Sequence, residues 1–179
     1  MFKIIRNIFR KRKLDKFASN IPTGFLPLKD ISNVNVVMDV EDPGFDQLKA
    51  DIMAWANQSG VRMNIYFFDF RKLDKDELLI TSIQTTIIKK DLDWTSTPDI
   101  SKVMGLLGEE SDLYISLIDN GDFPIDFISR CAKARFKIGR YAYPGHVFDM
   151  IFSGNRTEDL RSDSRKIFEA IVDFLGKIQ

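Results

Sequence analysis

Acidic side chains follow several predicted strands of this chain, at positions where α/β proteins commonly carry out chemistry. Asp39 and Asp42 come after the first strand, and Asp119 comes after a later one. Because open α/β sheets bind ligands beyond the carboxyl ends of their strands, these three carboxylates could share one rim. Mg²⁺ is typically held by one or two carboxylates, waters and phosphate oxygens. Asp39, Asp42 and Asp119 are therefore the candidate catalytic residues of a small metal-dependent phosphotransfer enzyme or hydrolase.

The same carboxylates also have a purely structural interpretation, which we favour. Asp42 and Asp122 each precede a predicted helix and can cap its free amide groups. Asp119 begins an Asp-Asn-Gly sequence that is ordinary turn chemistry. The glycines that would let a phosphate approach the backbone between strand and helix are absent. We therefore predict no cofactor and assign no metal ligand, with Mg²⁺ as the alternative.

Nucleophilic catalysis has little basis in the sequence. His146 is the only histidine, it falls in a predicted turn, and neither Gly-x-Ser-x-Gly nor a turn-borne cysteine accompanies it. The single Cys131 excludes an internal disulfide and a thiolate zinc cluster, which fits a reducing cytoplasm. The remaining candidate binding residues near this part of the chain are Asp122, Arg140, Tyr143 and His146.

A basic concentration later in the chain raises nucleic-acid binding as a further possibility. Its cations are Arg130, Lys133, Arg135, Lys137 and Arg140, with Tyr141 and Tyr143 nearby as stacking surfaces. Outside its first twenty residues, however, the chain is net acidic, whereas nucleic-acid-binding domains usually present a basic face. We therefore favour the interpretation that these cations lie on the solvated side of an edge strand, and we rank nucleic-acid binding below it.

The formal net charge of zero conceals a strong asymmetry. Residues 1–20 hold seven Lys or Arg and one acidic residue, which leaves +6 there and −6 on the remainder. Phe2, Ile5, Ile8 and Phe9 recur at helical spacing among these cations, as in an interfacial membrane helix. The alternative is a frayed or loosely docked basic helix. The candidate residues for membrane or partner contact are Lys3, Arg6, Arg10, Lys11, Arg12 and Lys13.

Apolar periodicity and turn residues then predict the elements that position these side chains. The strands are expected at 34–40, 61–70, 85–88, 112–118, 135–138 and 147–152, and the helices at 45–59, 100–107, 123–132 and 160–178, with a further helix start near 74–77. A helical crossover makes the first two strands parallel. Trp94 is expected to plug a loop onto the core.

The last two strands are predicted to form an antiparallel hairpin. The seven residues between them contain Pro144-Gly145, a turn signal, and are too few for a helical crossover. Lys137 would then face Asp149 across the pair. Alternation over 135–138 indicates a strand with one solvated side. The predicted fold is thus a three-layer, doubly wound, Rossmann-like α/β sandwich, mostly parallel, with an antiparallel edge.

Several stretches of this sequence resemble a family of small uncharacterised bacterial proteins, classed only as a domain of unknown function. The stretches are Lys89-Lys90-Asp91-Leu92-x-Trp94, Asp112-Leu113-x-Ile115-x-Leu117, 132–139 and Phe148-Asp149-Met150-Ile151. The resemblance covers roughly residue 34 to the C-terminus, together with the basic start. It implies kinship and carries no catalytic residues.

A weaker resemblance is to the N-terminal lobe of heptosyltransferase-type glycosyltransferases, through a strand that opens with Asp-Leu and a later Ala-Lys-x-Arg-like strand. Asp119-Asn120-Gly121-Asp122 replaces that family's helix entry, and 179 residues leave no room for the second lobe. A resemblance to one lobe of that fold does not imply glycosyltransferase activity.

The sequence therefore predicts three parts: a basic segment 1–20, a linker 21–32 and one α/β domain 33–179. The leading hypothesis is a noncatalytic binding or adaptor module in the cytoplasm, with the basic segment contacting the inner membrane surface or a protein partner. A small metal-dependent enzyme is the alternative.

Overall fold

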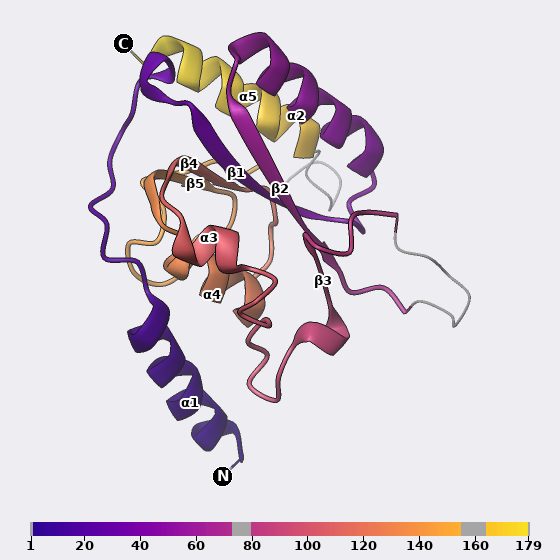
Figure 1. The fold of residues 1–179 in the computed structure, drawn as a ribbon, viewed down its shortest axis with the longest axis vertical. Coiled ribbons are helices and arrows are strands. Elements are labelled where there is room, and N and C mark those ends of the chain that lie inside the picture. The colour runs from indigo at the N-terminus through magenta and orange to yellow at the C-terminus, as the bar shows by residue number, and fades with distance from the viewer. Residues whose placement is uncertain (1, 73–79, 155–163, 179) are drawn as a thin grey trace.

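Runs of apolar residues form the strands of one parallel sheet, seen in the computed structural model, which describes residues 2–72, 80–154 and 164–178 (Figure 1). The strands are β1 (Asn33–Asp39), β2 (Arg62–Asp69), β3 (Thr86–Ile88), β4 (Ser111–Ser116), β5 (Ala134–Gly139) and β6 (Met150–Ile151). Their order across the sheet is β3-β2-β1-β4-β5-β6, and every neighbouring pair is parallel. The predicted α/β class and parallel sheet are confirmed.

Helices cover both faces of this sheet, so the predicted doubly wound arrangement is confirmed as well. The helices are α1 (Phe2–Phe17), α2 (Phe45–Ser59), α3 (Met104–Gly108), α4 (Phe123–Cys131) and α5 (Ser164–Lys177), with single 3₁₀ turns η1 (Leu28–Asp30) and η2 (Lys89–Asp91). In Figure 1, α2 and α5 lie side by side on one face, and α3 and α4 lie on the other.

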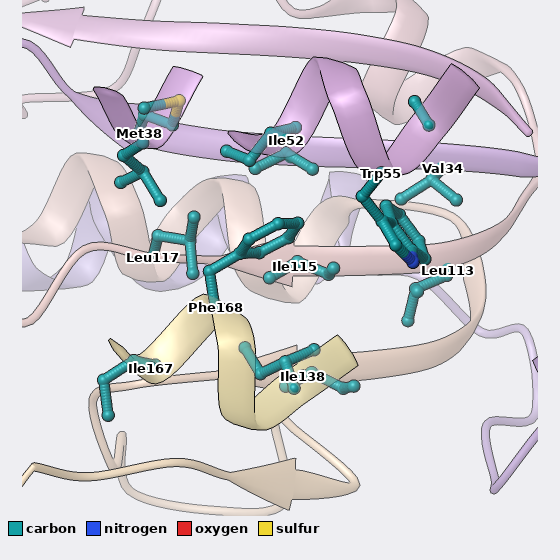
Figure 2. Packing of buried hydrophobic residues seen from close by; sticks show 14 of the residues in the cluster. Val34, Met38, Ile52, Trp55, Leu113, Ile115, Leu117, Ile138, Ile167 and Phe168 are labelled. Atoms are coloured by element: carbon teal, nitrogen blue, oxygen red, sulfur yellow. The ribbon is translucent and has the colours of Figure 1, made fainter. Parts of the chain in front are cut away.

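The two faces share the central strand. Val34, Val36 and Met38 of β1 pack under α2 and α5, together with Trp55 and Phe168 (Figure 2). Val37 points to the opposite cluster under α3 and α4. Because both faces of β1 are covered, its sequence is a nearly continuous apolar run rather than an alternating one.

The strand order reverses between β1 and β4, because β1 leads outward to β2 and β3 while β4 leads to β5 and β6. In open α/β sheets such a reversal is the usual position of a ligand-binding crevice, at the carboxyl ends of the strands. Gly60, in the left-handed conformation with φ 68°, ends α2, which matches the predicted helix over 45–59, and directs the chain into β2.

The predicted antiparallel edge hairpin is wrong. β6 pairs with β5 in parallel, with Ile138 opposite Met150 and Gly139 opposite Ile151. The connection returns across the α4 face of the sheet without a helix. Tyr143, Val147 and Phe148 are buried there, in the cluster beneath α4. Their burial, which the Pro144-Gly145 turn signal does not reveal, lets a short irregular segment act as a parallel crossover.

Lys137 consequently does not face Asp149 as an exposed ionic pair. The backbone amide of Lys137 donates to the Asp149 carboxylate at 2.8 Å, and the Asp149 amide donates to the Lys137 carbonyl at 2.9 Å. The Lys137 side chain lies beneath α4 and is 4% exposed. The predicted solvated side of this strand is therefore also wrong at Lys137, although β5 does lie next to the sheet edge.

Other differences are local. The helix predicted over 100–107 is confined to α3, because residues 100–103 form turns.

Trp94 does not pack into the core as predicted. Its side chain is 50% exposed, and its ring contacts Phe2 and Phe9 of α1. The predicted helix start at 74–77 and the beginning of the final helix, 160–163, lie outside the described residues.

The basic N-terminal segment forms α1, which contacts α4 at one end of the molecule (Figure 1). The chain then runs without regular structure to Pro27, and its backbone and side chains attach to the sheet edge. The Gly24 amide donates to the Arg135 carbonyl at 2.9 Å, and Phe25 packs edge-on against Phe136 and Phe174. None of the helices in the described residues is long and apolar enough to cross a bilayer.

Candidate functional site

Arg140 is the polar centre of the carboxyl edge of the sheet. It follows β5 directly and is 5% exposed. One guanidinium nitrogen, Nη1, donates to the Leu117 carbonyl at 2.9 Å and to the Ser164 hydroxyl at 2.6 Å. The other, Nη2, lies 3.8 Å from the Asp119 carboxylate. The guanidinium therefore joins the ends of β4 and β5 to the first residue of α5.

Asp42 belongs to the same network. Its carboxylate accepts a hydrogen bond from the Ser164 hydroxyl and another from the Gly44 amide, at 2.9 Å. The side chain does not cap α2 as predicted, because Gly44 occupies the cap position. Asp42 instead stabilises the turn before the helix and is connected through Ser164 to Arg140. Two of the predicted carboxylates are thus connected to one buried cation, Asp119 directly and Asp42 through the Ser164 hydroxyl.

Asp39 lies at the end of β1 among other acidic groups. Burial is the main reason that its pKa is raised, and the charges of Glu41, Asp42 and Asp69 raise it further. The Glu41 amide donates to Asp39 at 2.9 Å and partly offsets this effect. The charge of Asp69, in contrast, is balanced by Arg71, which donates to both of its carboxylate oxygens at 2.8 Å. The environment of Asp39 therefore favours the protonated carboxyl.

In the described residues, these carboxylates do not gather into a cluster of three ligands. No group of three His, Cys, Asp or Glu side chains within residues 2–72, 80–154 and 164–178 is placed to hold an ion. Asp42 and Asp119 direct their oxygens toward Ser164 and Arg140 instead. In the described part of the chain, these contacts stabilise the loop ends.

The other candidate binding residues differ in exposure and in their contacts. Tyr143 is buried and donates from its hydroxyl to the Asn120 carbonyl at 2.9 Å, which ties the crossover to the turn after β4. Burial raises the pKa of Tyr143. Asp122 is exposed at the start of α4 and makes no side-chain capping bond. His146 is exposed in the crossover.

The later basic concentration does not form one face either. Lys137 and Arg140 are buried, whereas Arg130 pairs with Asp126 at 2.7 Å and Arg135 pairs with Asp112 at 3.2 Å. This arrangement gives no support to nucleic-acid binding.

The six predicted contact cations all lie on α1, whose attachment to the body is polar toward its middle and apolar at its end, where Leu14 and Phe17 pack on the cluster beneath α4. The Arg10 Nε donates to the Thr95 carbonyl at 2.7 Å, and its guanidinium lies 4.1 Å from the centre of the Phe123 ring. Lys13 forms an ion pair with Asp93 and donates to the Thr95 hydroxyl at 3.2 Å. Aromatic contacts to Trp94 complete the attachment. No residue of α1 is buried.

The remaining surface of α1 is both apolar and basic. Ile4, Ile5 and Ile8 are 67%, 43% and 48% exposed. Lys3, Lys11 and Arg12 are also exposed. Exposed apolar side chains that cluster on one element mark an interaction site more often than singly scattered ones do. This helix is therefore the best-defined candidate for a functional surface in the described chain.

The sequence did not single out the body residues that receive α1. Asp93 and Thr95 lie in a loop whose only visible signal was the Asp-x-Thr-x-Thr spacing, and Thr95 is fully buried. Ser164 was also missed, because it falls within the apolar stripe of the final helix. Its role depends on Arg140 and Asp42, which are distant in sequence.

The strand order and the two helical layers define an α/β protein with a Rossmann-like parallel sheet. The chain belongs to a family described as "Family of unknown function (DUF6913)", whose model matches residues 5–168. Searches of the curated proteins and of the solved structures gave no match. The resemblance to an uncharacterised domain is thus confirmed, whereas the heptosyltransferase resemblance has no support from these comparisons.

Proposed function

We propose that the protein is a noncatalytic binding module that attaches to an anionic membrane surface through α1. The observation that carries this proposal is the exposure of Ile4, Ile5 and Ile8 on a helix that is rich in cations. A helix that packs on a protein core turns its apolar stripe inward. A helix that lies in a membrane interface turns the same kind of stripe toward lipid.

Charge favours lipid as the binding partner. The +6 on residues 1–20 contrasts with the −6 on the rest of the chain. Each Lys or Arg near an anionic leaflet contributes about 1 kcal/mol of attraction. The acidic body is repelled by the same surface, so the molecule would be oriented with α1 toward the lipid. The proposed location is therefore the inner face of the membrane, with the protein bound peripherally.

The surroundings of α1 also suit a flat surface better than a shaped protein partner. The helix lies at one end of the molecule's longest axis, with its N-terminus directed away from the sheet (Figure 1). Trp94, which is half exposed, lies against Phe9 beside the apolar side chains. Tryptophan is enriched at membrane–water interfaces, where its ring sits at the level of the headgroups.

The test is co-sedimentation of the full chain with phosphatidylcholine vesicles, with and without phosphatidylglycerol. We expect binding only to the anionic vesicles, and we expect added salt to weaken it. Replacing both Ile5 and Ile8 by Gln removes apolar contact with lipid while retaining every cation. This double variant should bind about tenfold more weakly or worse, given ~1.5–3 kcal/mol for each fully buried Ile.

The matched control is Met53→Gln, which changes a similarly exposed apolar residue (43%) on α2, far from α1 in sequence. It should bind like the wild type. If the wild type does not sediment with anionic vesicles, or if the Ile variant binds as tightly as the control, membrane attachment through α1 is wrong. An acidic protein would then be the binding partner to test for the exposed surface of α1.

A further inference from the structure

The loop over residues 92–98, here called the Asp93 loop, is built as an acceptor for positive charge. The carboxylate of Asp93 accepts from the Thr95 hydroxyl at 2.6 Å, the Thr95 amide at 2.8 Å and the Thr97 amide at 3.1 Å. The loop is closed by a hydrogen bond from the Asp93 amide to the Thr97 carbonyl, at 3.0 Å. This network holds the carboxylate in a fixed position.

The cations that the loop receives come from the middle of α1, whereas Leu14 and Phe17 at its end pack on the cluster beneath α4. Arg10 and Lys13 make the polar contacts with the loop, but no residue of the helix is buried. A cleft of about 420 Å³ lies beside this contact, lined by Lys13 and Phe17 of α1 and by residues 90–93 and 97–100 of the body. Partly exposed ion pairs of this kind are worth little and are screened by salt.

Arg10 and Lys13 are also suitable ligands for lipid phosphates. Guanidinium groups bind phosphate oxygens in a bidentate manner, and lysine binds them as a point charge. A cation held by Asp93 or by the Thr95 carbonyl has fewer N–H groups available for these contacts, and its position is fixed against the body. The rings of Phe2 and Phe9, which pack on Trp94 in the docked helix, are likewise withheld from lipid.

We propose that the Asp93 loop is a latch that holds α1 on the body, and that an anionic lipid surface opens it by competing for Arg10 and Lys13. The competition rests on the proposed membrane attachment, whereas the latch itself is independent of lipid. The chain between α1 and Pro27 has no regular structure, so the helix can leave the loop without unfolding a strand. Opening adds two cations and two aromatic rings to the surface available to the membrane.

The latch is tested first without lipid, by amide hydrogen exchange of residues 2–17 in full-length protein. Asp93→Asn removes the charge that holds Lys13. We expect exchange in α1 to rise roughly 1.4- to fivefold, in line with the ~0.2–1 kcal/mol of an exposed ion pair. Acrylamide should also quench Trp94 more strongly, because Trp55, the only other tryptophan, is buried. Lys13→Gln opens the latch from the helix side and should raise exchange similarly.

Asp99→Asn is the matched control, because Asp99 lies just beyond the same loop and accepts hydrogen bonds from Ser101 rather than from α1. It should leave exchange in α1 unchanged. If Asp93→Asn and Lys13→Gln both exchange like the control, the latch is refuted.

Competition is tested next with phosphatidylcholine–phosphatidylglycerol vesicles. An open latch should lower the lipid concentration at which half of the Asp93→Asn protein is bound, by the same factor as the rise in exchange. Equal or weaker binding than wild type would show that α1 engages lipid while docked, which refutes the competition. If no variant binds vesicles, the proposed function and the lipid competitor both fail, and the lipid-free exchange result still decides whether Asp93 holds α1.

Discussion

At the scale of single residues, Lys137 is the least expected feature of the chain. Its ammonium group lies beneath α4 and donates to the carbonyls of Ser129 and Arg130, at 2.9 and 3.5 Å. These carbonyls belong to the last turn of α4, where the helix itself supplies no partner for such groups. Burial lowers the pKa of Lys137 to about 8. The buried ammonium group of Lys137 therefore supplies hydrogen-bond donors to the backbone carbonyls at the end of α4.

This position predicts a pH-dependent stability. An unfolded lysine has a pKa of about 10.4, so between about pH 8 and about pH 10 the unfolded chain binds more protons than the folded one. The free energy of unfolding contributed by Lys137 should therefore rise with pH in this window, by up to about 3 kcal/mol. Urea unfolding at several pH values should show a stability that rises less, or falls more, between about pH 8 and about pH 10 for Lys137→Met than for wild type.

The comparison between chains removes the contributions of groups that titrate in both of them. Burial raises the pKa of Cys131 to about 12, and it also raises the pKa of Tyr114, so both oppose the effect of Lys137 as the pH rises. Lys29→Met, at an exposed position, should keep the wild-type profile. Parallel profiles for wild type and Lys137→Met would show that Lys137 has an ordinary affinity for protons in the folded protein.

At the scale of elements, the contact between Gly139 and Phe148 determines how the crossover packs on β5. A side chain at Gly139 would overlap the Phe148 ring, which is buried and stacks on Tyr114. Because the ring cannot move aside freely, Gly139→Ala should lower the free energy of unfolding by ~1–3 kcal/mol. Thermal or urea unfolding measures this loss.

The control for that substitution is Gly176→Ala, in the last turn of α5, where an added Cβ meets nothing within 4 Å. It should be neutral or stabilise by up to about 1 kcal/mol, because alanine is the better helix former. Equal effects of the two substitutions would mean that the crossover does not depend on close approach to β5.

The same crossover shows where prediction from the sequence stops. Strand β1, helix α2 and the parallel β1–β2 pair follow from apolar spacing, the Asp42-Pro43-Gly44 turn and Gly60, all of which are local signals. The Pro144-Gly145 turn was also recognised, but a turn does not say which way the chain continues. The direction of β6 depends on the burial of Tyr143 and Phe148 beneath a distant helix. No local pattern encodes that packing.

The candidate site was predictable to a similar extent. The positions of Asp39, Asp42 and Asp119 at strand ends follow from the parallel sheet. Their partners do not, because Ser164 lies 122 residues from Asp42 in the chain. The cations of α1 were visible as a pattern, but their acceptors in the Asp93 loop became apparent only in three dimensions.

At the scale of the whole molecule, Arg140 joins parts of the chain that are far apart in sequence. It connects the end of β5 with the end of β4, the start of α5 and, through Ser164, the turn before α2. Arg140→Met would leave the Leu117 carbonyl and the Ser164 hydroxyl without this donor in a buried setting. We expect the free energy of unfolding to fall by roughly 3 kcal/mol, as measured by urea denaturation.

Arg135→Met provides the comparison, because the Arg135 side chain is 47% exposed and makes one ion pair with Asp112. Its loss should cost between about 0 and about 1 kcal/mol. If the two arginine variants are equally stable, the carboxyl edge is not held together by Arg140.

The attachment of the linker to the sheet has a mechanical consequence. A pull on α1 would run down the extended chain to Thr23, which donates to Asp149 at 2.6 Å, and to Gly24 and Phe25, which are fixed to β5 and α5. These contacts lie before the first strand and spread tension over two neighbouring elements. A displacement of α1 would therefore be resisted by these contacts before it reached β1, and β1 would keep its position in the sheet.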